Sequence, residues 1–254
     1  MAIVSSTRQV NLIVAGLDPS GGAGLIIDTR VHQHFGVFPV GVITANTVQT
    51  TCRSLSLTYT DEGFLKDQLL NLKEDFDIGT IKVGMLGKIR FLEILLELFP
   101  EKRIVLDPVI TSKGGLKLLD QPEVLNDFAE NLYLITPNIE EAQLLTQSNT
   151  TYPLRLLELL RKQGYRNILL KGGHLEGKYS TDYLLTQEGK LITLKGRRIN
   201  KSPRGTGCAL SSAIAASLTL GNGLVESVNR AKNFVQRAIE NAIKAGKCHE
   251  ILKF

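Results

Sequence analysis

Short apolar runs alternate with longer amphipathic segments along most of this chain. A run of about four to eight apolar residues is typical of a strand buried on both faces, whereas a helix repeats its apolar residues three and four positions apart. Leu65, Leu69 and Leu72 show that helical spacing. These patterns predict strands at residues 11–15, 40–48, 80–83, 103–106, 132–135 and 167–170, and helices at residues 23–35, 61–76, 89–99, 154–163, 205–218 and 224–245. Such alternation predicts an α/β fold whose mainly parallel sheet is covered by helices on both faces.

The stretch 175–198 departs from this alternation. Two apolar-rich runs at residues 183–186 and 191–194 flank the turn sequence QEGK at residues 187–190, which predicts a β-hairpin. No internal repeat, low-complexity tract or Pro/Ser-rich linker interrupts the chain. A single domain over residues 1–254 is therefore expected.

A polar or glycine-rich cluster follows the carboxyl end of five predicted strands. In chain order the clusters are DPSGGAG, GML, DPV, TPN and KGGH. The carboxyl ends of parallel strands meet at one edge of a sheet, and ligands bind at that edge in open α/β folds. We therefore expect the five clusters to line one binding site.

The chain's 254 residues and 27.9 kDa are enough to bury a full hydrophobic core. Its 30 Lys and Arg residues nearly balance 25 Asp and Glu residues, which leaves a net charge of +5 with no long block of one sign. That balance disfavours a dedicated nucleic-acid-binding protein and suits an enzyme that handles anionic ligands. No apolar run approaches the ~20 residues that span a bilayer, and the apolar stretch 10–17 lacks the layout of a signal peptide. We expect a soluble cytoplasmic protein that binds neither nucleic acid nor membrane.

The three cysteines, Cys52, Cys208 and Cys248, stand far apart and include no CxxC pair. Neither a zinc site nor a disulfide framework is indicated by this spacing. An odd number of cysteines also fits a reducing compartment.

The common nucleotide-binding motifs do not fit. Residues 172–178 match GxxxxGK, but Tyr179 replaces the Ser or Thr that would bind Mg²⁺, and no helix pattern begins there. The pattern GxGxxG also fails, because Ile27 and Leu210 stand where its third glycine would be.

The strongest candidate site is the sequence RGTGCALSS at residues 204–212, which leads into a predicted helix. Glycines before a helix leave backbone N–H groups free at the positive end of the helix dipole, where they can hold an oxyanion or a phosphoryl group. Cys208 falls in the first turn, where the thiolate should be stabilised and the sulfur could act as a base or nucleophile. Alternatively, Cys208 is a small buried residue beneath a tight turn.

Seven sequences resemble the signatures of hydroxymethylpyrimidine/phosphomethylpyrimidine kinases, which are thiamin-pathway members of the ribokinase-like superfamily. They are AGLDPSGGAG, VITANTVQTT, KVGML, VLDPV, LITPNIEEA, LLKGGHLEG and GTGCALSSAIAA, in the family's order over residues 11–216. The chain departs from the family at Leu17, where Thr or Ser is usual, and at Arg204, where His is usual. Its ending from about residue 246 also lacks the family's Gly/His-rich character.

The resemblance implies a three-layer α/β/α sandwich with a mainly parallel central sheet and a small β flap that includes residues 40–48. It implies ATP-dependent phosphorylation of 4-amino-5-hydroxymethyl-2-methylpyrimidine, and of the resulting monophosphate, in thiamin biosynthesis. ATP with Mg²⁺ would be the phosphoryl donor. The family also suggests a homodimer.

The resemblance makes Cys208 the general base, which takes the proton of the substrate's hydroxymethyl group before attack on the γ-phosphate. The N–H groups of Gly205, Thr206, Gly207 and Cys208 would hold the developing charge. Gln49 would hold the pyrimidine, because an amide complements the ring nitrogen and exocyclic amine.

Three apolar residues match family positions that line the pyrimidine pocket, although core packing would also account for them: Ala23, Met85 and Val109. Asp18 could bind the ring or cap its own turn. Asn46 and Thr47 are weaker candidates for the same pocket.

Asp107 and Glu141 are the predicted metal residues, because Mg²⁺ takes oxygen ligands, here through water. Asn138 and Glu141 form the superfamily's N-x-x-E element, and Asn138 is expected on the ATP side. Lys171 ends a predicted strand beside two glycines and is expected to reach phosphates. Arg204 could contact a phosphate of ATP or of the monophosphate, or stand at a tolerant position.

The histidines are weaker candidates for functional residues. His32 and His34 lie two positions apart on a predicted helix, do not share a face and are expected at the surface. His174 is predicted to be structural or to bind phosphate weakly.

Two rival functions remain. A pyridoxal or pyridoxine kinase shares the fold and a hydroxymethyl group on an aromatic nitrogen ring, and Gln49 favours the pyrimidine without deciding the matter. A non-catalytic binding protein would be expected to lose Cys208, Lys171 or the N-x-x-E element, and all three are present.

Overall fold

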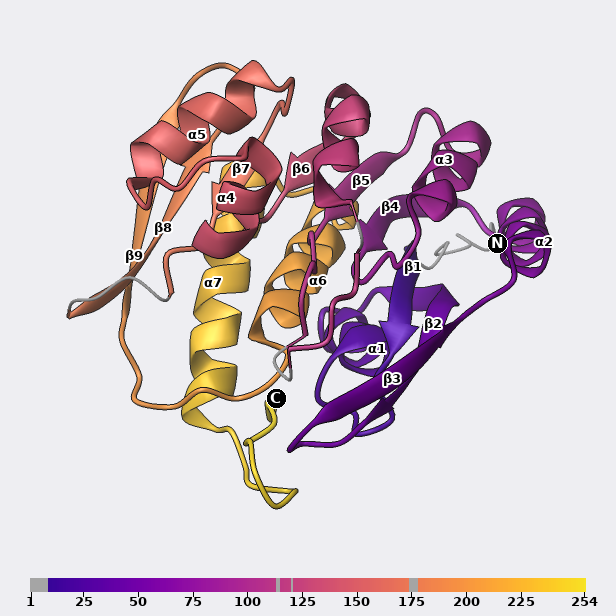
Figure 1. Ribbon diagram of the computed structural model, residues 1–254, viewed down its shortest axis with the longest axis horizontal. Coiled ribbons are helices and arrows are strands. Elements are labelled where there is room, and N and C mark those ends of the chain that lie inside the picture. The colour runs from indigo at the N-terminus through magenta and orange to yellow at the C-terminus, as the bar shows by residue number, and fades with distance from the viewer. Residues whose placement is uncertain (1–8, 113–114, 120, 174–177) are drawn as a thin grey trace, which may run out of the picture.

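The computed structural model describes residues 9–112, 115–119, 121–173 and 178–254. Within these ranges nine strands form one sheet in the order β3-β2-β1-β4-β5-β6-β7-β8-β9 (Figure 1). The strands are β1 (Val10–Leu17), β2 (Phe38–Gln49), β3 (Ser54–Tyr59), β4 (Ile78–Val83), β5 (Arg103–Leu106), β6 (Leu134–Ile135), β7 (Ile168–Leu170), β8 (Tyr179–Leu185) and β9 (Leu191–Arg197). From β2 to β7 in this order the strands run parallel to one another. At the edges β3 pairs with β2, β8 with β7 and β9 with β8 in antiparallel fashion. The predicted mainly parallel sheet is confirmed.

Helices cover both faces of the sheet (Figure 1). One layer holds α1 (Gly24–His34), α6 (Thr206–Thr219) and α7 (Leu224–Glu240); the other holds α2 (Glu62–Asp75), α3 (Ile89–Leu98), the 3₁₀ helix η1 (Pro122–Asn131), α4 (Ile139–Thr146) and α5 (Pro153–Lys162). Among the described helices, none has the length and apolar character needed to cross a membrane. The predicted three-layer α/β/α sandwich is confirmed.

Each helix layer closes its own apolar core against the sheet. In β5, Ile104 and Leu106 face the core beneath α2 to α5, whereas Val105 between them faces the core beneath α1, α6 and α7. Successive side chains of a strand point to opposite faces, so a strand covered on both sides is apolar at most of its positions. This is why the central strands were recognisable as continuous apolar runs.

The flap is built from the outer end of a long strand. β2 pairs with β1 up to Asn46, and from Ala45 onward it also pairs with β3 in antiparallel fashion. β3 was not predicted, because the strand has only six residues and none of them is fully buried. The predicted hairpin is confirmed by the pairing of Leu185 with Leu191 in β8 and β9.

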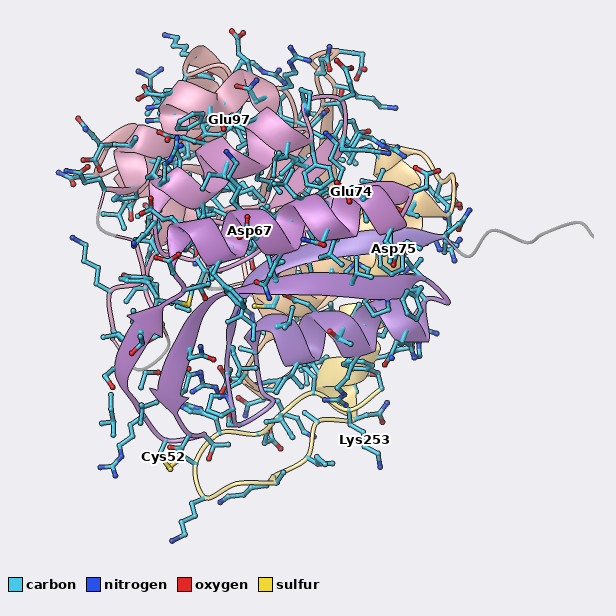
Figure 2. All side chains as sticks on the ribbon, turned by 90° about the vertical axis from the view of Figure 1, so that its right-hand side faces the viewer. Cys52, Asp67, Glu74, Asp75, Glu97 and Lys253 are labelled. Carbon is cyan, nitrogen blue, oxygen red and sulfur yellow. A yellow bond between two sulfur atoms is a disulfide. The ribbon has the colours of Figure 1, made fainter. Side chains whose placement is uncertain are left out.

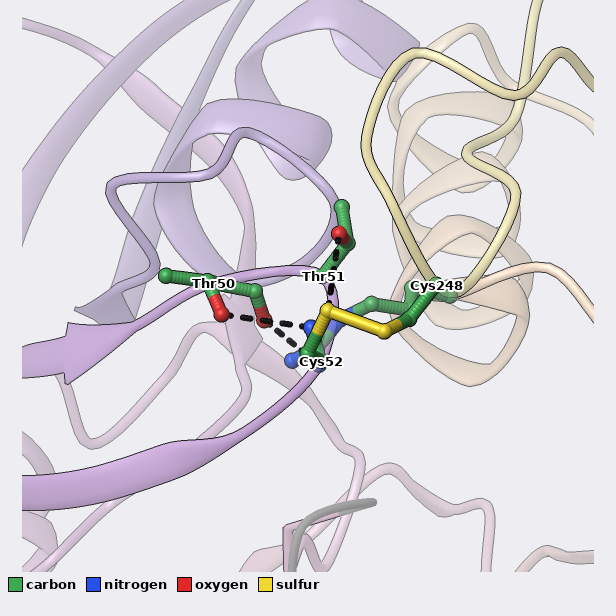
Figure 3. The surroundings of a disulfide bond; sticks show 5 residues. Thr50, Thr51, Cys52 and Cys248 are labelled. Atoms are coloured by element: carbon green, nitrogen blue, oxygen red, sulfur yellow. Dashed lines mark hydrogen bonds between the residues drawn. A yellow bond between two sulfur atoms is a disulfide. The ribbon is translucent and has the colours of Figure 1, made fainter.

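The chain's C-terminal part differs most from expectation. α7 ends at Glu240 and not at residue 245. Beyond it the chain folds back, and Cys248 forms a disulfide with Cys52 in the turn between β2 and β3 (Figure 3). The prediction of no disulfide is wrong, because 196 residues of separation say nothing about proximity in space.

His32 is buried and not at the surface, which corrects the prediction. It lies on the inner face of α1, where its Nδ1 is 2.7 Å from the carbonyl oxygen of Asp28. Burial lowers the pKa of His32 to about 4, so the ring is neutral at pH 7. His34 is exposed as predicted, and His174 lies outside the described residues.

Candidate functional site

All of the main predicted site residues line one cavity of about 280 Å³ at the carboxyl edge of the parallel strands. These residues are Asp18, Ala23, Gln49, Met85, Asp107, Val109, Asn138, Glu141, Lys171, Arg204, Gly205, Thr206, Gly207 and Cys208. They come from segments spread over most of the chain, and the shared direction of the strands brings them together. Their individual roles stay predictions.

The glycine turn before α6 forms one wall of this cavity. Gly205 is the N-cap of α6 and has a φ of +79°, a conformation that favours glycine. A Cβ at this position would also collide with the carbonyl oxygen of Gly22. No side chain caps the helix, so its first N–H groups are available to an anion in the cavity.

Cys208 lies in the first turn of α6 and lines the cavity. Burial raises the pKa of its thiol to about 12, with the charge of Lys82 opposing the shift and Asp28 and Asp107 adding to it. The prediction of a stabilised thiolate is therefore wrong for the free protein. Loss of hydration outweighs the favourable dipole of the helix.

Lys171 joins two carboxylates directly behind the glycine turn. Its Nζ is 2.7 Å from Oδ1 of Asp107 and 3.7 Å from Oε2 of Glu141. A Cβ on Gly207 would be 3.3 Å from the same Nζ, which shows how closely the turn approaches this group. Burial alone would lower the pKa of Lys171, but the two carboxylates outweigh burial and raise it, so the ammonium stays charged.

In the structure, Asn138 and Glu141 of the N-x-x-E element cap the start of α4. The Asn138 side chain accepts a bond from the Glu141 N–H at 2.8 Å, and the Glu141 side chain accepts from the Asn138 N–H at 2.7 Å. Burial raises the pKa of Glu141 to about 7, with the nearby Asp107 charge adding to the shift and Lys171 opposing it. A cation bound nearby would favour the ionised form of Glu141.

The described residues contain no group of three His, Cys, Asp or Glu side chains that could hold a metal ion directly. Asp107 and Glu141 nevertheless fit a hydrated Mg²⁺ that arrives on nucleotide phosphates, since they supply buried carboxylate oxygens beside the glycine turn. Lys171 already contacts both carboxylates, which favours contacts to the metal through water.

Alternate residues of β2 face the other end of the cavity. Thr47 and Gln49 line it, whereas Asn46 is exposed and does not. The Thr47 hydroxyl donates to the carbonyl of Leu17 at 2.8 Å, and Oε1 of Gln49 accepts from the Ser54 hydroxyl at 3.0 Å. β3 thus orients the amide that was predicted to bind the pyrimidine.

An apolar cluster forms the floor at this end. Met85 and Leu118 pack with Ala45, and Val109 packs against them. Leu118 was missed by the sequence analysis, as were two further lining residues, Thr111 and Ser112. Both directly continue the DPV cluster, so a longer reading of that loop would have found them.

Asp18 caps its own turn, one of the two roles considered for it. Its Oδ1 accepts bonds from the N–H and the hydroxyl of Ser20 at 2.9 and 2.7 Å. The side chain is buried and also lines the cavity. Contact with the ring of a substrate stays a prediction.

Arg204 is almost fully buried, at 4% exposure. Its Nη1 donates to the carbonyl of Thr50 at 3.1 Å, and its Nη2 lies 3.6 Å from Oδ2 of Asp18. The side chain lines the cavity described above. Its predicted contact with a phosphate is not tested by these bonds.

A second cavity of about 830 Å³ meets the first at the glycine turn. Lys171, Gly173, Pro203, Thr206 and Gly207 line both cavities. The second cavity adds five basic residues that the sequence analysis missed: Lys178, Arg197, Arg198, Lys201 and Lys232. Their charge suits a polyphosphate. They come from the residue before β8, from the end of β9 and the segment after it, and from α7, so only the tertiary fold assembles them.

The two cavities therefore have different characters and one junction. The smaller holds an amide and an apolar floor, and the larger is basic. At the junction lie the N–H groups at the start of α6 and the Lys171 ammonium, and Cys208 follows directly in the wall of the smaller cavity. Such a layout can bring a small heterocycle and a phosphorylated ligand together with the reacting group between them.

The phosphomethylpyrimidine kinase family model matches residues 18–253. A hydroxymethylpyrimidine/phosphomethylpyrimidine kinase of Aquifex aeolicus is 38% identical over 97% of this chain and 100% of that protein. Its counterpart in Haemophilus influenzae is 34% identical over 97% of this chain and 96% of that protein.

Solved structures show the same ribokinase-like fold. The phosphomethylpyrimidine kinase of Clostridium difficile superposes with a TM-score of 0.76 at 31% identity, covering 91% of this chain and 100% of that one. A pyridoxal kinase of Staphylococcus aureus in complex with ADP superposes with a TM-score of 0.88 at 24% identity, covering 97% and 93%. The latter likeness is one of fold alone.

Proposed function

Because the chain belongs to the phosphomethylpyrimidine kinase family, we propose that it transfers the γ-phosphoryl group of ATP to 4-amino-5-hydroxymethyl-2-methylpyrimidine. We further propose that it phosphorylates the resulting monophosphate, within thiamin biosynthesis. The observation that carries the proposal is the junction of an amide-lined cavity and a basic cavity at a glycine turn that bears Cys208.

In this mechanism the pyrimidine occupies the smaller cavity, with its ring on the apolar floor and its polar edge at Gln49. The hydroxymethyl oxygen then faces Cys208, whose thiolate form accepts its proton as the new O–P bond forms and the bond from the γ-phosphorus to the leaving oxygen of ADP breaks. The N–H groups at the start of α6 hold the charge on the transferring group, and Lys171 holds a neighbouring phosphate oxygen. The chain thus positions the two reactants and stabilises the charge.

Mg²⁺ bound to the nucleotide would neutralise phosphate charge and orient the triphosphate. Asp107 and Glu141 would hold its water ligands, with Asn138 beside them. Lys171 balances these carboxylates when the nucleotide is absent.

The proposal is tested by steady-state kinetics with ATP and either the hydroxymethylpyrimidine or pyridoxal. We expect kcat/KM to be at least about 100-fold higher for the pyrimidine, because a site built for specific hydrogen bonds rejects a ligand that leaves them unmade. Pyridoxal kinase is the second candidate, since pyridoxal kinases share this fold closely. A higher kcat/KM for pyridoxal would overturn the assignment.

Replacing Gln49 with alanine should raise the KM of the pyrimidine by about 10-fold to 100-fold and leave the KM of ATP within about twofold. The amide supplies hydrogen bonds to one ligand only, and a polar group left unpaired costs about 1–3 kcal/mol. Asn46→Ala is the matched control, because Asn46 is exposed three residues earlier on the same strand. Equal losses for both substrates would remove Gln49 from pyrimidine recognition.

We also propose a homodimer. Val48 and Leu55 expose 56% of their surface on the two strands of the flap, which offers an apolar patch for a second copy. Light scattering would measure the mass directly, and a monomeric mass at micromolar concentration would refute the dimer. A cytoplasmic location is proposed because ATP is an intracellular nucleotide, and cell fractionation would test it.

A further inference from the structure

The chain beyond α7 returns across the pyrimidine end of the molecule as a narrow hairpin. Ile243 and Ile251 exchange two backbone hydrogen bonds, at 3.0 and 2.9 Å, and so close a loop over residues 243–251. We call this loop the strap. Figure 1 shows it below α7, beside the outer end of the β2–β3 flap.

The outer side of the strap is fastened to the turn between β2 and β3. The disulfide joins Cys248 to Cys52 (Figure 3). The N–H of His249 lies 3.4 Å from the carbonyl oxygen of Thr51. Gly246 packs so closely on Thr51 that a Cβ there would collide with the threonine side chain. Figure 2 shows Cys52 at the edge of the flap, next to the C-terminal chain.

The inner side of the strap is fastened to Arg204. The backbone N–H of Arg204 donates to the carbonyl of Glu250 at 2.9 Å. Ile251 packs against Gly22, where a Cβ would lie 3.3 Å from the isoleucine Cγ2. The strap therefore supports the glycine turn and the Asp18 loop from outside.

Arg204 carries this support to the residue that follows Gln49. Its guanidinium spans from the Thr50 carbonyl to the Asp18 carboxylate, and burial shields both contacts from water. The end of β2 is thus held from two sides, by Arg204 on the buried side and by the disulfide on the outer side.

We propose that Arg204 and the strap are positioning elements for Gln49, and that reduction of the Cys52–Cys248 disulfide selectively weakens binding of the pyrimidine. The proposal rests on the function proposed above for the choice of ligand. A side chain at a strand end binds tightly only if its backbone is already held in place, since ordering it on binding costs free energy. The nucleotide cavity lies on the other side of the glycine turn, and residues 243–251 do not line it. One partly exposed ion pair, Lys201 with Glu250 at 3.7 Å, links its rim to the strap.

The chemical step in the test is thiol–disulfide exchange with dithiothreitol. One dithiothreitol molecule supplies two electrons and two protons, the S–S bond breaks, and two cysteine thiols form while the reagent closes to its cyclic disulfide. Cys208 is already a free thiol and is unchanged by the reagent. Thiol titration of the unfolded, unreduced chain should find one thiol, and three would overturn the proposal at the outset.

Kinetics at fixed temperature then compare oxidised and reduced protein. Reduction should raise the KM of the pyrimidine about fivefold or more, with kcat and the KM of ATP within about twofold. Cys248→Ser should show the raised KM with or without dithiothreitol. Lys247→Ala, an exposed change in the same strap, should match wild type in both states. An unchanged pyrimidine KM in reduced wild type, or an equal change for ATP, would overturn the proposal.

Gly246→Val tests the contact between the strap and Thr51 independently of the disulfide. It keeps both cysteines, but its side chain displaces Thr51. It should raise the same KM. Hydrogen exchange gives a readout that needs no turnover: amides of residues 46–53 should exchange faster after reduction, whereas those of α3 should not. If the chain fails to phosphorylate the pyrimidine, the proposed function falls, and unchanged exchange in residues 46–53 would independently refute the strap.

Discussion

Replacing Cys208 with serine should lower kcat by about 10²- to 10⁴-fold while leaving the KM of the pyrimidine within about threefold. This range is what a positioned proton acceptor contributes to a reaction. A hydroxyl in place of the thiol keeps the size and the contacts of the first turn of α6 but is a far weaker base. Steady-state kinetics on the purified variant measure the effect, and an unchanged kcat would remove Cys208 from the chemistry.

The pH profile gives an independent measure of the same role. Because burial raises the pKa of Cys208 to about 12, the thiolate fraction increases about tenfold for each pH unit across the neutral range. The wild-type kcat/KM for the pyrimidine, which reports ionisation of the free enzyme, should therefore rise steadily from about pH 7 to pH 9, and Cys208→Ala should lose that rise. A wild-type profile that is already flat at pH 7 would contradict the role of this thiol as the base.

Replacing Lys171 with methionine should lower kcat/KM for ATP by about 10²- to 10³-fold, the range seen when one fixed donor to a developing charge is lost. Two effects act together. The phosphate loses its ammonium, and the Asp107 carboxylate loses a partner at 2.7 Å inside the protein. The pKa of Glu141, already about 7 through burial, should rise further once the lysine charge is gone.

Two controls separate this result from a general loss of structure. Lys171→Arg keeps the charge and should recover part of the activity, although the guanidinium is bulkier. Lys190→Met removes an exposed lysine in the β8–β9 turn and should leave kcat/KM unchanged. A melting temperature near that of wild type is required of each variant. A Lys171→Met enzyme within fivefold of wild type would exclude the phosphate role.

Much of the fold could be predicted because the central strands are covered on both faces. Residues 11–15 and 103–106 are continuous apolar runs for that reason, and their positions agree with β1 and β5. β3 escaped because a flap strand is half exposed and lacks such a run. The end of α7 was placed too late because residues 241–245 (NAIKA) continue the helical pattern as far as Gly246.

Most residues that line the site could also be predicted, but the pKa shifts within it could not. Clusters that follow parallel strands must meet at one edge, so Asp107, Lys171 and Cys208 were expected together and line one cavity. The pKa of Cys208 was expected to fall and instead is raised, because burial depends on what the rest of the chain places around the sulfur. His32 was misplaced for the same reason: helical spacing identifies neighbours along a helix, not the layer that covers it.

The residue pattern of the chain alone settles the order of most strands and helices, the α/β class and most of the loops that form the cavity, since each follows from periodicity and strand direction. The folded chain settles what depends on distance between remote residues: the Cys52–Cys248 disulfide, the basic second cavity, and the bonds of Arg204 to Thr50 and Asp18. Neighbouring residues determine local secondary structure, whereas burial and charge pairing arise only when segments far apart in the chain are packed against one another.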